Sequence, residues 1–152
     1  MLRDNINNSL KDAMKAGDAP RVSTLRLVNS SLKNADIEAR GQGKPALSDE
    51  EALGVLQKMI KQRHESVELY EKGGRPELAA QERNEIVIIE KYLPVQMTDH
   101  EISETIAALL KETGATAMKD MGRVMAALKE RYAGKLDFGK ASAAVKKMLS
   151  GG

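Results

Sequence analysis

The sequence predicts an all-α fold, and three observations support this class. Apolar residues recur at steps of three and four along most of the chain. Signals that start and stop helices follow one another at regular intervals. Aromatic residues make up only 3% of the chain, so the core must be built from aliphatic side chains and eight methionines, which suit helix-on-helix packing. The expected architecture is a four-helix N-terminal unit over residues 1–94, followed by a small three-helix unit over residues 95–152.

The first two predicted helices are separated by a short turn. The first is expected over residues 2–16, where apolar residues repeat at helical spacing. Gly17 suits the position after a helix end, because glycine readily adopts a left-handed conformation. Asp18 is a natural cap for the next helix, which is expected to end near Arg40.

The third and fourth predicted helices carry their own start signals. Ser48 and Glu51 have the spacing of a capping box, in which each side chain accepts the other residue's N–H. Pro76 is well placed as the first residue of the fourth helix. Residues 86–89, Ile-Val-Ile-Ile, favour a strand by propensity alone. We predict a helix there, because helix-forming residues flank this run and no turn signal bounds it.

A short joint separates the two predicted units. Pro94 has no N–H and disfavours helical geometry in the residue before it, so the fourth helix is expected to end near Tyr92. Thr98 and Glu101 then form a second capping box that starts a fifth helix. The alternative is an ordinary loop between helices of one domain.

The C-terminal unit is predicted to contain three helices. Gly114 is expected to end the first, and Thr116 to cap the second. Gly134 breaks the chain, and Asp137 can cap the last helix. Gly122 falls inside the second of these helices, where glycine costs about 1 kcal/mol relative to alanine. A close helix crossing would explain this glycine, and close approach of an RNA backbone is the sharper interpretation.

Positive charge is concentrated at the end of the chain. The whole sequence has a formal net charge of +2, and residues 1–94 carry 15 basic and 15 acidic side chains. Residues 113–152 carry eight basic against three acidic side chains, a net charge of +5. The eight candidates for RNA binding are Lys119, Arg123, Lys129, Arg131, Lys135, Lys140, Lys146 and Lys147.

These cations have two interpretations. They could contact a phosphate backbone, where affinity comes from the release of counterions. They could instead form a solvated polar face, which is how most runs of charge are explained. No aromatic residue is clearly interleaved with them, so base stacking is poorly supported and shape and phosphate contacts would have to suffice.

No catalytic residue, metal ligand or cofactor site is predicted. The chain has no cysteine, and His64 and His100 lack metal-ligand spacing. Glu82 and Glu85 could form a carboxylate pair, although acids three residues apart are common on helices. There is no Gly-rich phosphate loop and no nucleophile elbow. The N-terminus has no apolar signal segment and no apolar run reaches about 20 residues, so we expect a cytoplasmic protein without a membrane partner.

From Leu2 to Leu149 the chain resembles the GatB/YqeY-like family. The most specific segments are the joint YLP at residues 92–94 and MKDMG at residues 118–122. Four longer stretches carry the resemblance: STLRLVNSSLKNADIEAR, LQKMIKQRHESVELYEKGGR, EIVIIEKYLPVQMTDHEI and GATAMKDMGRVMAALKERYAGKLDFGKASAAVKKML.

The resemblance implies a C-terminal unit that looks like the tail of the B subunit of the glutamine-dependent aminoacyl-tRNA amidotransferase. In that enzyme the tail helps to hold tRNA, while ATP use and amide transfer occur in a separate catalytic cradle. Residues 118–125 match the pattern of the tail, whereas Phe138 stands where the family often has a smaller residue. The family label, carbon–nitrogen ligase with glutamine as amide donor, follows from kinship alone.

Three hypotheses of function follow. The first is an accessory protein that binds tRNA or structured RNA through its last two helices. The second is an adaptor that docks on an aminoacyl-tRNA synthetase or an amidotransferase, because a core of about 55 residues is marginal by itself. The third is an enzyme of amide transfer, which rests on kinship only.

Overall fold

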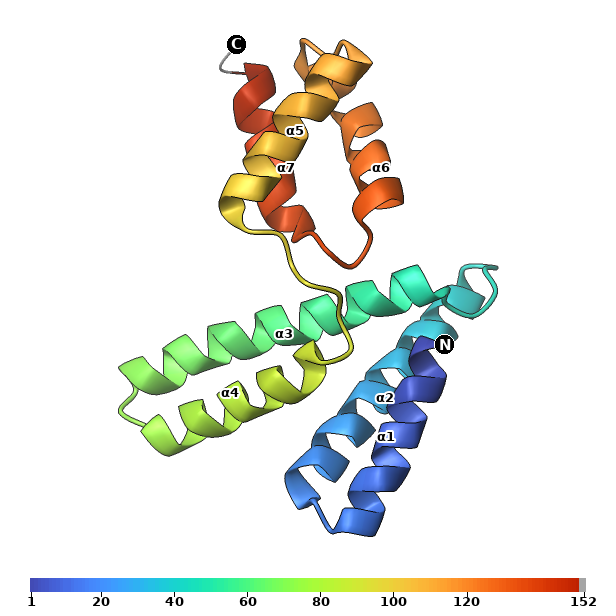
Figure 1. The fold of residues 1–152 in the computed structure, drawn as a ribbon, viewed down its shortest axis with the longest axis vertical. Coiled ribbons are helices and arrows are strands. Elements are labelled where there is room, and N and C mark those ends of the chain that lie inside the picture. The colour runs from blue at the N-terminus through green and yellow to red at the C-terminus, as the bar shows by residue number, and fades with distance from the viewer. Residues whose placement is uncertain (151–152) are drawn as a thin grey trace. The chain divides into compact units, whose positions relative to one another are not determined.

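The computed structural model describes residues 1–150 and is all-α (Figure 1). Among these residues there is no β-strand, which confirms the predicted fold class. The elements, in chain order, are α1 (Leu2–Ala16), α2 (Ala19–Gly41), α3 (Asp49–Lys72), α4 (Pro76–Glu90), α5 (Asp99–Thr113), the 3₁₀ turn η1 (Met118–Asp120), α6 (Met121–Tyr132) and α7 (Phe138–Ser150).

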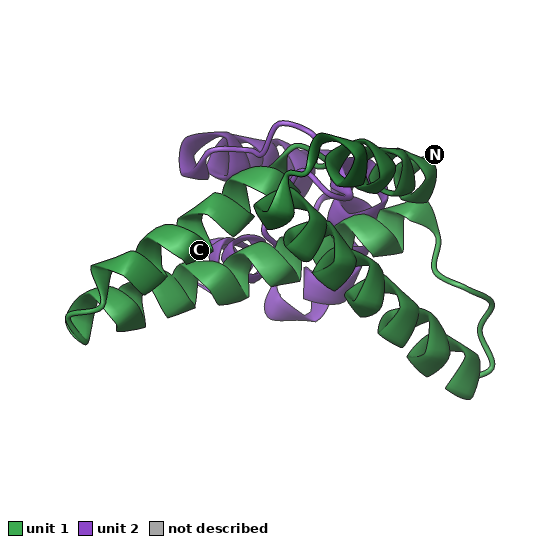
Figure 2. Ribbon diagram, turned by 90° about the horizontal axis from the view of Figure 1, so that it is seen from below, with its two compact units in different colours: residues 1–93 green, residues 94–152 purple. Residues whose placement is uncertain are grey.

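The chain divides into two compact units, coloured separately in Figure 2. Unit 1 comprises Met1–Leu93 and contains α1 to α4. Unit 2 comprises Pro94–Gly152 and contains α5, η1, α6 and α7. The boundary between the units is the Leu93–Pro94 peptide bond.

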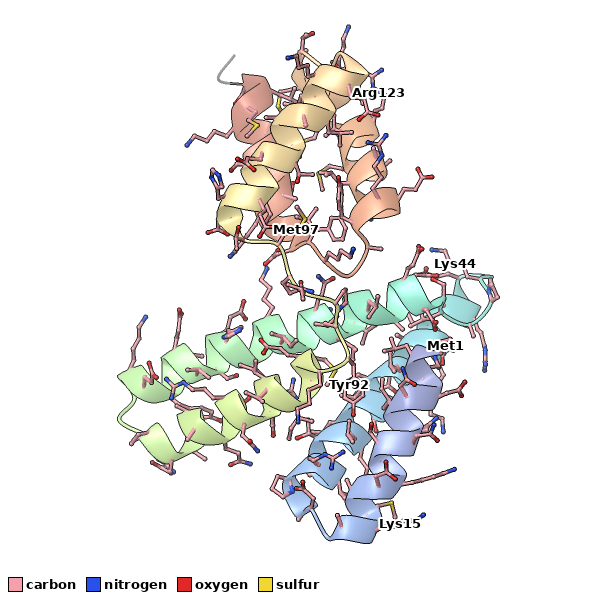
Figure 3. The ribbon with its side chains drawn as sticks, in the orientation of Figure 1. Met1, Lys15, Lys44, Tyr92, Met97 and Arg123 are labelled. Atoms are coloured by element: carbon pink, nitrogen blue, oxygen red, sulfur yellow. The ribbon has the colours of Figure 1, made fainter. Side chains whose placement is uncertain are left out.

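Unit 1 is built from two antiparallel helix pairs, α1 with α2 and α3 with α4 (Figure 1). All four helices contribute to one core, whose buried residues are Leu2, Ile6, Leu25, Val28, Leu32, Ala52, Leu56, Met59, Ile88 and Ile89. Tyr92, labelled in Figure 3, packs against this core just after α4. A smaller cluster of Val67, Ala79 and Ile86 lies between α3 and α4. Residues 86–89 are helical as predicted, because three of their side chains are buried in these two clusters.

Helix ends in unit 1 follow the sequence signals. Gly17 ends α1 with φ of 68°, a left-handed conformation that favours glycine. Asp18 accepts the N–H of Arg21 at 3.3 Å and caps α2. Both bonds of the Ser48–Glu51 capping box are present at the start of α3. The end of α4 differs slightly, because the helix stops at Glu90 and two tighter turn bonds lead the chain to the proline.

A salt bridge between Arg3 and Asp36 fastens α1 to α2. The guanidinium donates to both carboxylate oxygens of Asp36, at 2.6 and 2.7 Å. The backbone N–H of Leu47 donates to the same carboxylate at 2.9 Å, which ties the loop before α3 to α2. Hydrogen bonds from Arg3 and Leu47 lower the pKa of Asp36 to about 2, from an ordinary value of 3.8.

We predict that Asp36→Asn destabilises unit 1 at pH 7. Because the pKa of Asp36 is lower in the folded chain, its ion pair stabilises the fold fully above about pH 4. This contribution is lost as the pH falls toward 2, the folded pKa. The free energy of unfolding, measured with urea at several pH values between 7 and 2, should therefore depend less on pH in the variant than in the parent protein. Asp12→Asn, at an exposed position of α1, is the control and should match the parent protein.

Unit 2 encloses a separate aliphatic core between its three helices. Its buried residues are Ile102, Ile106, Leu109, Ala115, Val124, Leu128, Leu136, Ala141, Val145 and Leu149. The segment before α5 belongs to this unit, because the N–H of Met97 donates to the carbonyl of Lys135 at 2.9 Å. The Thr98–Glu101 capping box starts α5, with both bonds at 3.1 Å, as predicted. The ring of Phe138 packs against the core.

The start of the second helix of unit 2 differs from the prediction. Thr116 is not its cap. The helix begins as the 3₁₀ turn η1, and the carboxylate of Asp120 accepts the N–H groups of Thr116 and Ala117 at 3.1 and 3.3 Å. The carboxylate reaches back across the turn to N–H groups at its start, as the acidic residue of a capping box does. These bonds lower the pKa of Asp120.

Gly122 does not mark a close helix crossing, so that expectation is wrong. It is the second residue of α6, it is exposed, and a Cβ atom built on it would meet no neighbouring atom within 4 Å. It also lacks a positive φ. The fold therefore has no steric or conformational need for glycine at this position.

We predict that Gly122→Ala stabilises unit 2 by about 0.5 to 1 kcal/mol, because alanine loses less backbone entropy in a helix. Gly114→Ala is the matched control. Gly114 has φ of 69°, so alanine there should destabilise the unit by roughly 1 kcal/mol. Urea unfolding followed by circular dichroism measures both changes. A destabilised Gly122→Ala variant would contradict the open surroundings of Gly122.

Candidate nucleic-acid interface

All eight predicted RNA-binding side chains lie in unit 2 and are exposed. They come from four elements of the chain. Lys119 lies in η1 and Lys135 in the loop before α7. Helix α6 carries Arg123, Lys129 and Arg131, and helix α7 carries Lys140, Lys146 and Lys147. Arg123 is labelled in Figure 3.

Three of the eight cations form ion pairs with carboxylates of unit 2 itself. Arg131 donates to both oxygens of Glu112, at 2.7 and 2.9 Å, and this lowers the pKa of Glu112. Lys140 lies 3.1 Å from Asp99. Arg123 lies 3.3 Å from Asp120. Two of these carboxylates belong to α5, so this helix neutralises one cation on α6 and one on α7.

The cations of α6 do not share one face. Successive residues of a helix are rotated by about 100°, so Arg123, Lys129 and Arg131 point in three different directions. The Glu112 pair marks the flank of α6 that is closest to α5. Lys129 precedes Arg131 by two residues and therefore lies on the opposite flank, away from α5. The structure thus does not gather the eight side chains on a single surface.

Helix α7 shows the same division. Because Lys140 forms an ion pair with Asp99, it lies on the flank of α7 that is closest to α5. Lys147 is seven residues further on, so it lies in line with Lys140 and shares its face, as the sequence analysis expects. Lys146 lies about 120° away, on the flank turned from α5.

Two lysines line the same boundary between α6 and α7. Each of these two lysines follows a buried residue of its helix, Leu128 or Val145, and so lies about 100° from the buried face, on the side away from the cation that pairs with α5. Helices α6 and α7 are in contact. Lys129 on α6 and Lys146 on α7 therefore border one boundary, which we name the α6–α7 seam. Within residues 1–150 neither lysine forms an ion pair. Lys119 and Lys135 flank α6 in the sequence, at its beginning and its end.

The boundary between α5 and α6 has the opposite character. A hollow of about 270 Å³ opens there. Its lining residues are Glu104, Thr105, Ala108, Leu109, Glu112, Arg131 and Tyr132. Two carboxylates border it, and the cation it contains is already held by Glu112. An anionic ligand is therefore disfavoured on this side of unit 2.

The other candidate residues considered above, Glu82, Glu85 and His100, interact with side chains of their own unit. Burial raises the pKa of Glu82, and the negative charge of Glu85 adds to this shift. Glu85 is itself paired with Arg63 at 2.8 Å, which joins α3 to α4. His100 lies 2.9 Å from Glu104 on the exposed face of α5. Residues 1–150 contain no group of three or more histidine, aspartate and glutamate side chains that could hold a metal ion.

Within the described chain, no helix combines the length and the apolar character that crossing a membrane requires.

Known proteins with similar sequences point to one family. The model of the YqeY-like protein family matches residues 3–149. Three similar proteins are fungal and share the name altered inheritance of mitochondria protein 41, mitochondrial. That of Vanderwaltozyma polyspora is 33% identical over 76% of this chain, that of Lachancea thermotolerans 39% over 71%, and that of Clavispora lusitaniae 32% over 97%.

The matched regions cover different shares of these relatives. They span 64% of the Vanderwaltozyma protein, 57% of the Lachancea protein and 85% of the Clavispora protein. The family match covers nearly the whole chain and includes both units of the fold. The chain therefore belongs to the YqeY-like protein family.

Proposed function

We propose that this protein binds tRNA or another structured RNA through unit 2, with the α6–α7 seam as the contact surface. The observation that carries the proposal is the division of charge around unit 2. Lys129 and Lys146 border the seam without a carboxylate partner, whereas α5 carries four of the seven acidic side chains of unit 2, including the partners of Arg131 and Lys140. A polyanion approaching unit 2 meets least repulsion at the seam.

The chemistry of the seam suits phosphate rather than base recognition. Lysine is a flexible point charge, which contacts phosphate oxygens without a fixed geometry. Gly122, on the same flank of α6 as Lys129, has open space around it and would let a backbone approach closely. Tyr132 and Phe138, the aromatic residues of α6 and α7, both pack against the core of unit 2. We therefore infer recognition by shape and charge.

We further infer that residues 95–152 act as the RNA-binding domain and residues 1–94 as a second domain that supports it. The resemblance of the C-terminal unit to the tail of the amidotransferase B subunit supports an accessory role in amide transfer, with the catalytic residues and any cofactor supplied by another protein. The family label of carbon–nitrogen ligase and a cytoplasmic location remain predictions. The names of the fungal relatives describe those proteins as mitochondrial.

The test is binding of bulk tRNA, followed by fluorescence anisotropy across a salt series. We expect Lys129→Glu/Lys146→Glu to weaken binding about tenfold or more at low salt. The slope of log affinity against log salt should become shallower by about 2, because two phosphate contacts are lost. Both positions are exposed, so the variant should keep the helical content of the parent protein.

Lys58→Glu/Lys61→Glu provides the matched control, because it makes the same change in net charge on exposed positions of α3. An equal loss in both variants would show that net charge alone governs binding. Unchanged binding in the seam variant would contradict the proposed surface.

The second candidate function is an adaptor that docks on an aminoacyl-tRNA synthetase or an amidotransferase. Two apolar side chains of unit 1 favour it, because Leu69 on α3 is 70% exposed and Val87 on α4 is 54% exposed. A protein partner that covered these two side chains would remove their apolar surface from water. Recovery of such an enzyme in stoichiometric amount after nuclease treatment, lost in a Leu69→Ser/Val87→Ser variant, would support the adaptor instead.

A further inference from the structure

The outward face of α2 carries a line of three cations. Arg26, Lys33 and Arg40 follow one another at seven-residue spacing, which places them on one side of the helix about 10 Å apart. All three are exposed, and none forms an ion pair within residues 1–150. Arg40 is close enough to help lower the pKa of Asp36, but both oxygens of that carboxylate are already bound by Arg3 and Leu47.

The charge around this line is positive although unit 1 as a whole is balanced. Residues 1–45 carry eight basic and five acidic side chains, a net charge of +3. Residues 46–94 carry seven basic and ten acidic side chains, a net charge of −3. Among the acids of the first pair of helices, Asp18 caps α2 and Asp36 is held by Arg3, so Glu38 is the one remaining acid on α2.

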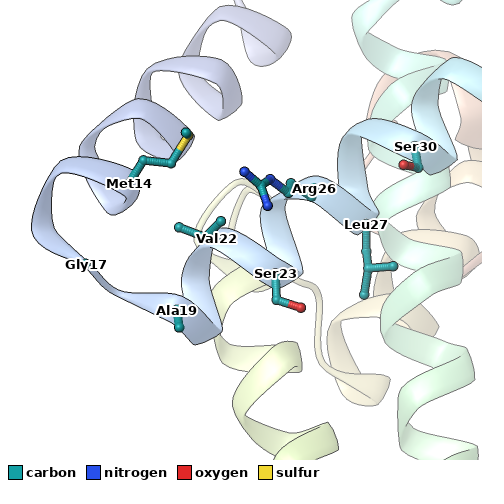
Figure 4. A pocket seen from close by; sticks show the side chains of 8 residues that line it. All are labelled: Met14, Gly17, Ala19, Val22, Ser23, Arg26, Leu27 and Ser30. Atoms are coloured by element: carbon teal, nitrogen blue, oxygen red, sulfur yellow. The ribbon is translucent and has the colours of Figure 1, made fainter.

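A hollow of about 650 Å³ lies beside Arg26, at the end of the α1–α2 pair (Figure 4). Its apolar lining includes Met14 and Leu27, which are 53% and 44% exposed. The hydroxyls of Ser23 and Ser30 also line it. The hollow is wide and open to solvent, and it combines apolar side chains with a few hydrogen-bonding groups, which suits a flat group that lies against its wall.

We infer that this face of α2 is a second RNA contact, which takes an unpaired loop of a structured RNA. The cation line binds successive parts of the phosphate backbone, and the hollow takes an unstacked base against Met14 and Leu27. The guanidinium of Arg26 lies at the edge of the hollow, where it can stack on the base or bind a phosphate. The inference rests on the proposed function, because it takes the ligand to be RNA.

Two alternatives explain fewer of these observations. A plain duplex would use the cations but leave the apolar hollow empty. An acidic amphipathic helix of a protein partner would use both, but it would leave the hydroxyls of Ser23 and Ser30, which line the hollow, without a role. The test therefore separates loop RNA from duplex RNA and from an acidic helix.

The experiment compares two fluorescent RNAs of equal nucleotide number, a hairpin with an unpaired loop and a fully paired duplex, binding to the full-length protein. We expect the parent protein to bind the hairpin about fivefold to tenfold more tightly. Met14→Ser/Leu27→Ser should abolish this preference without changing the salt slope. Arg26→Gln/Lys33→Gln/Arg40→Gln should weaken the binding of both RNAs and make the salt slope shallower by about 2 to 3.

The control is Lys58→Gln/Lys61→Gln/Lys72→Gln, which removes the same charge from exposed positions of α3. The circular dichroism spectrum of each variant is compared with that of the parent protein to check that the variant is folded. Equal binding of hairpin and duplex by the parent protein would overturn the assignment of the hollow. Binding of a synthetic amphipathic peptide of leucine and glutamate in place of RNA, lost in Met14→Ser/Leu27→Ser, would overturn the ligand class.

The failure of this inference and that of the proposed function give different results. If the seam variant binds normally and the α2 variant does not, the proposed seam is wrong and the α2 contact stands. If the seam variant loses binding and the α2 variant binds like its control, the α2 contact is wrong. Absence of RNA binding by the parent protein at low salt overturns both.

Discussion

The ion pairs that α5 makes with its two neighbours determine which cations of unit 2 are available to a ligand. Glu112 holds Arg131 on α6, and Asp99 holds Lys140 on α7. Exposed pairs of this kind each contribute less than about 1 kcal/mol to stability. Their larger effect is on the distribution of charge, because they neutralise one cation on α6 and one on α7 and leave Lys129 and Lys146, on the other flanks of these helices, unpaired.

Most of the fold could be predicted from local signals. The capping boxes at Ser48 and Thr98 fix two helix starts, and aliphatic spacing fixes the helices themselves. The start of α6 could not be predicted, because the carboxylate of Asp120 caps the turn from within and a preceding hydroxyl is the commoner pattern. The role of Gly122 could not be predicted either, because a crossing partner depends on tertiary packing.

The candidate sites were less predictable than the fold. Composition identifies the cations near the C-terminus, but only the fold shows that α5 supplies carboxylates to some of them. In unit 1 composition misleads in the other direction. The net charge of residues 1–94 is zero, but the part of the chain with the first helix pair is positive and the part with the second pair is negative. A seven-residue spacing of basic residues on α2 is the signal in the sequence that could have revealed its cation line.

The seam is built from lysine and not from arginine, and this choice has a chemical consequence. Acetylation of Lys129 or Lys146 would remove one positive charge and leave the fold intact, because both amines are exposed and outside every ion pair of the described chain. Arg131, which holds α6 to α5, is not a substrate for this modification. Acetylation in the seam would thus weaken the RNA binding that we propose and leave the Arg131–Glu112 pair between α6 and α5 intact.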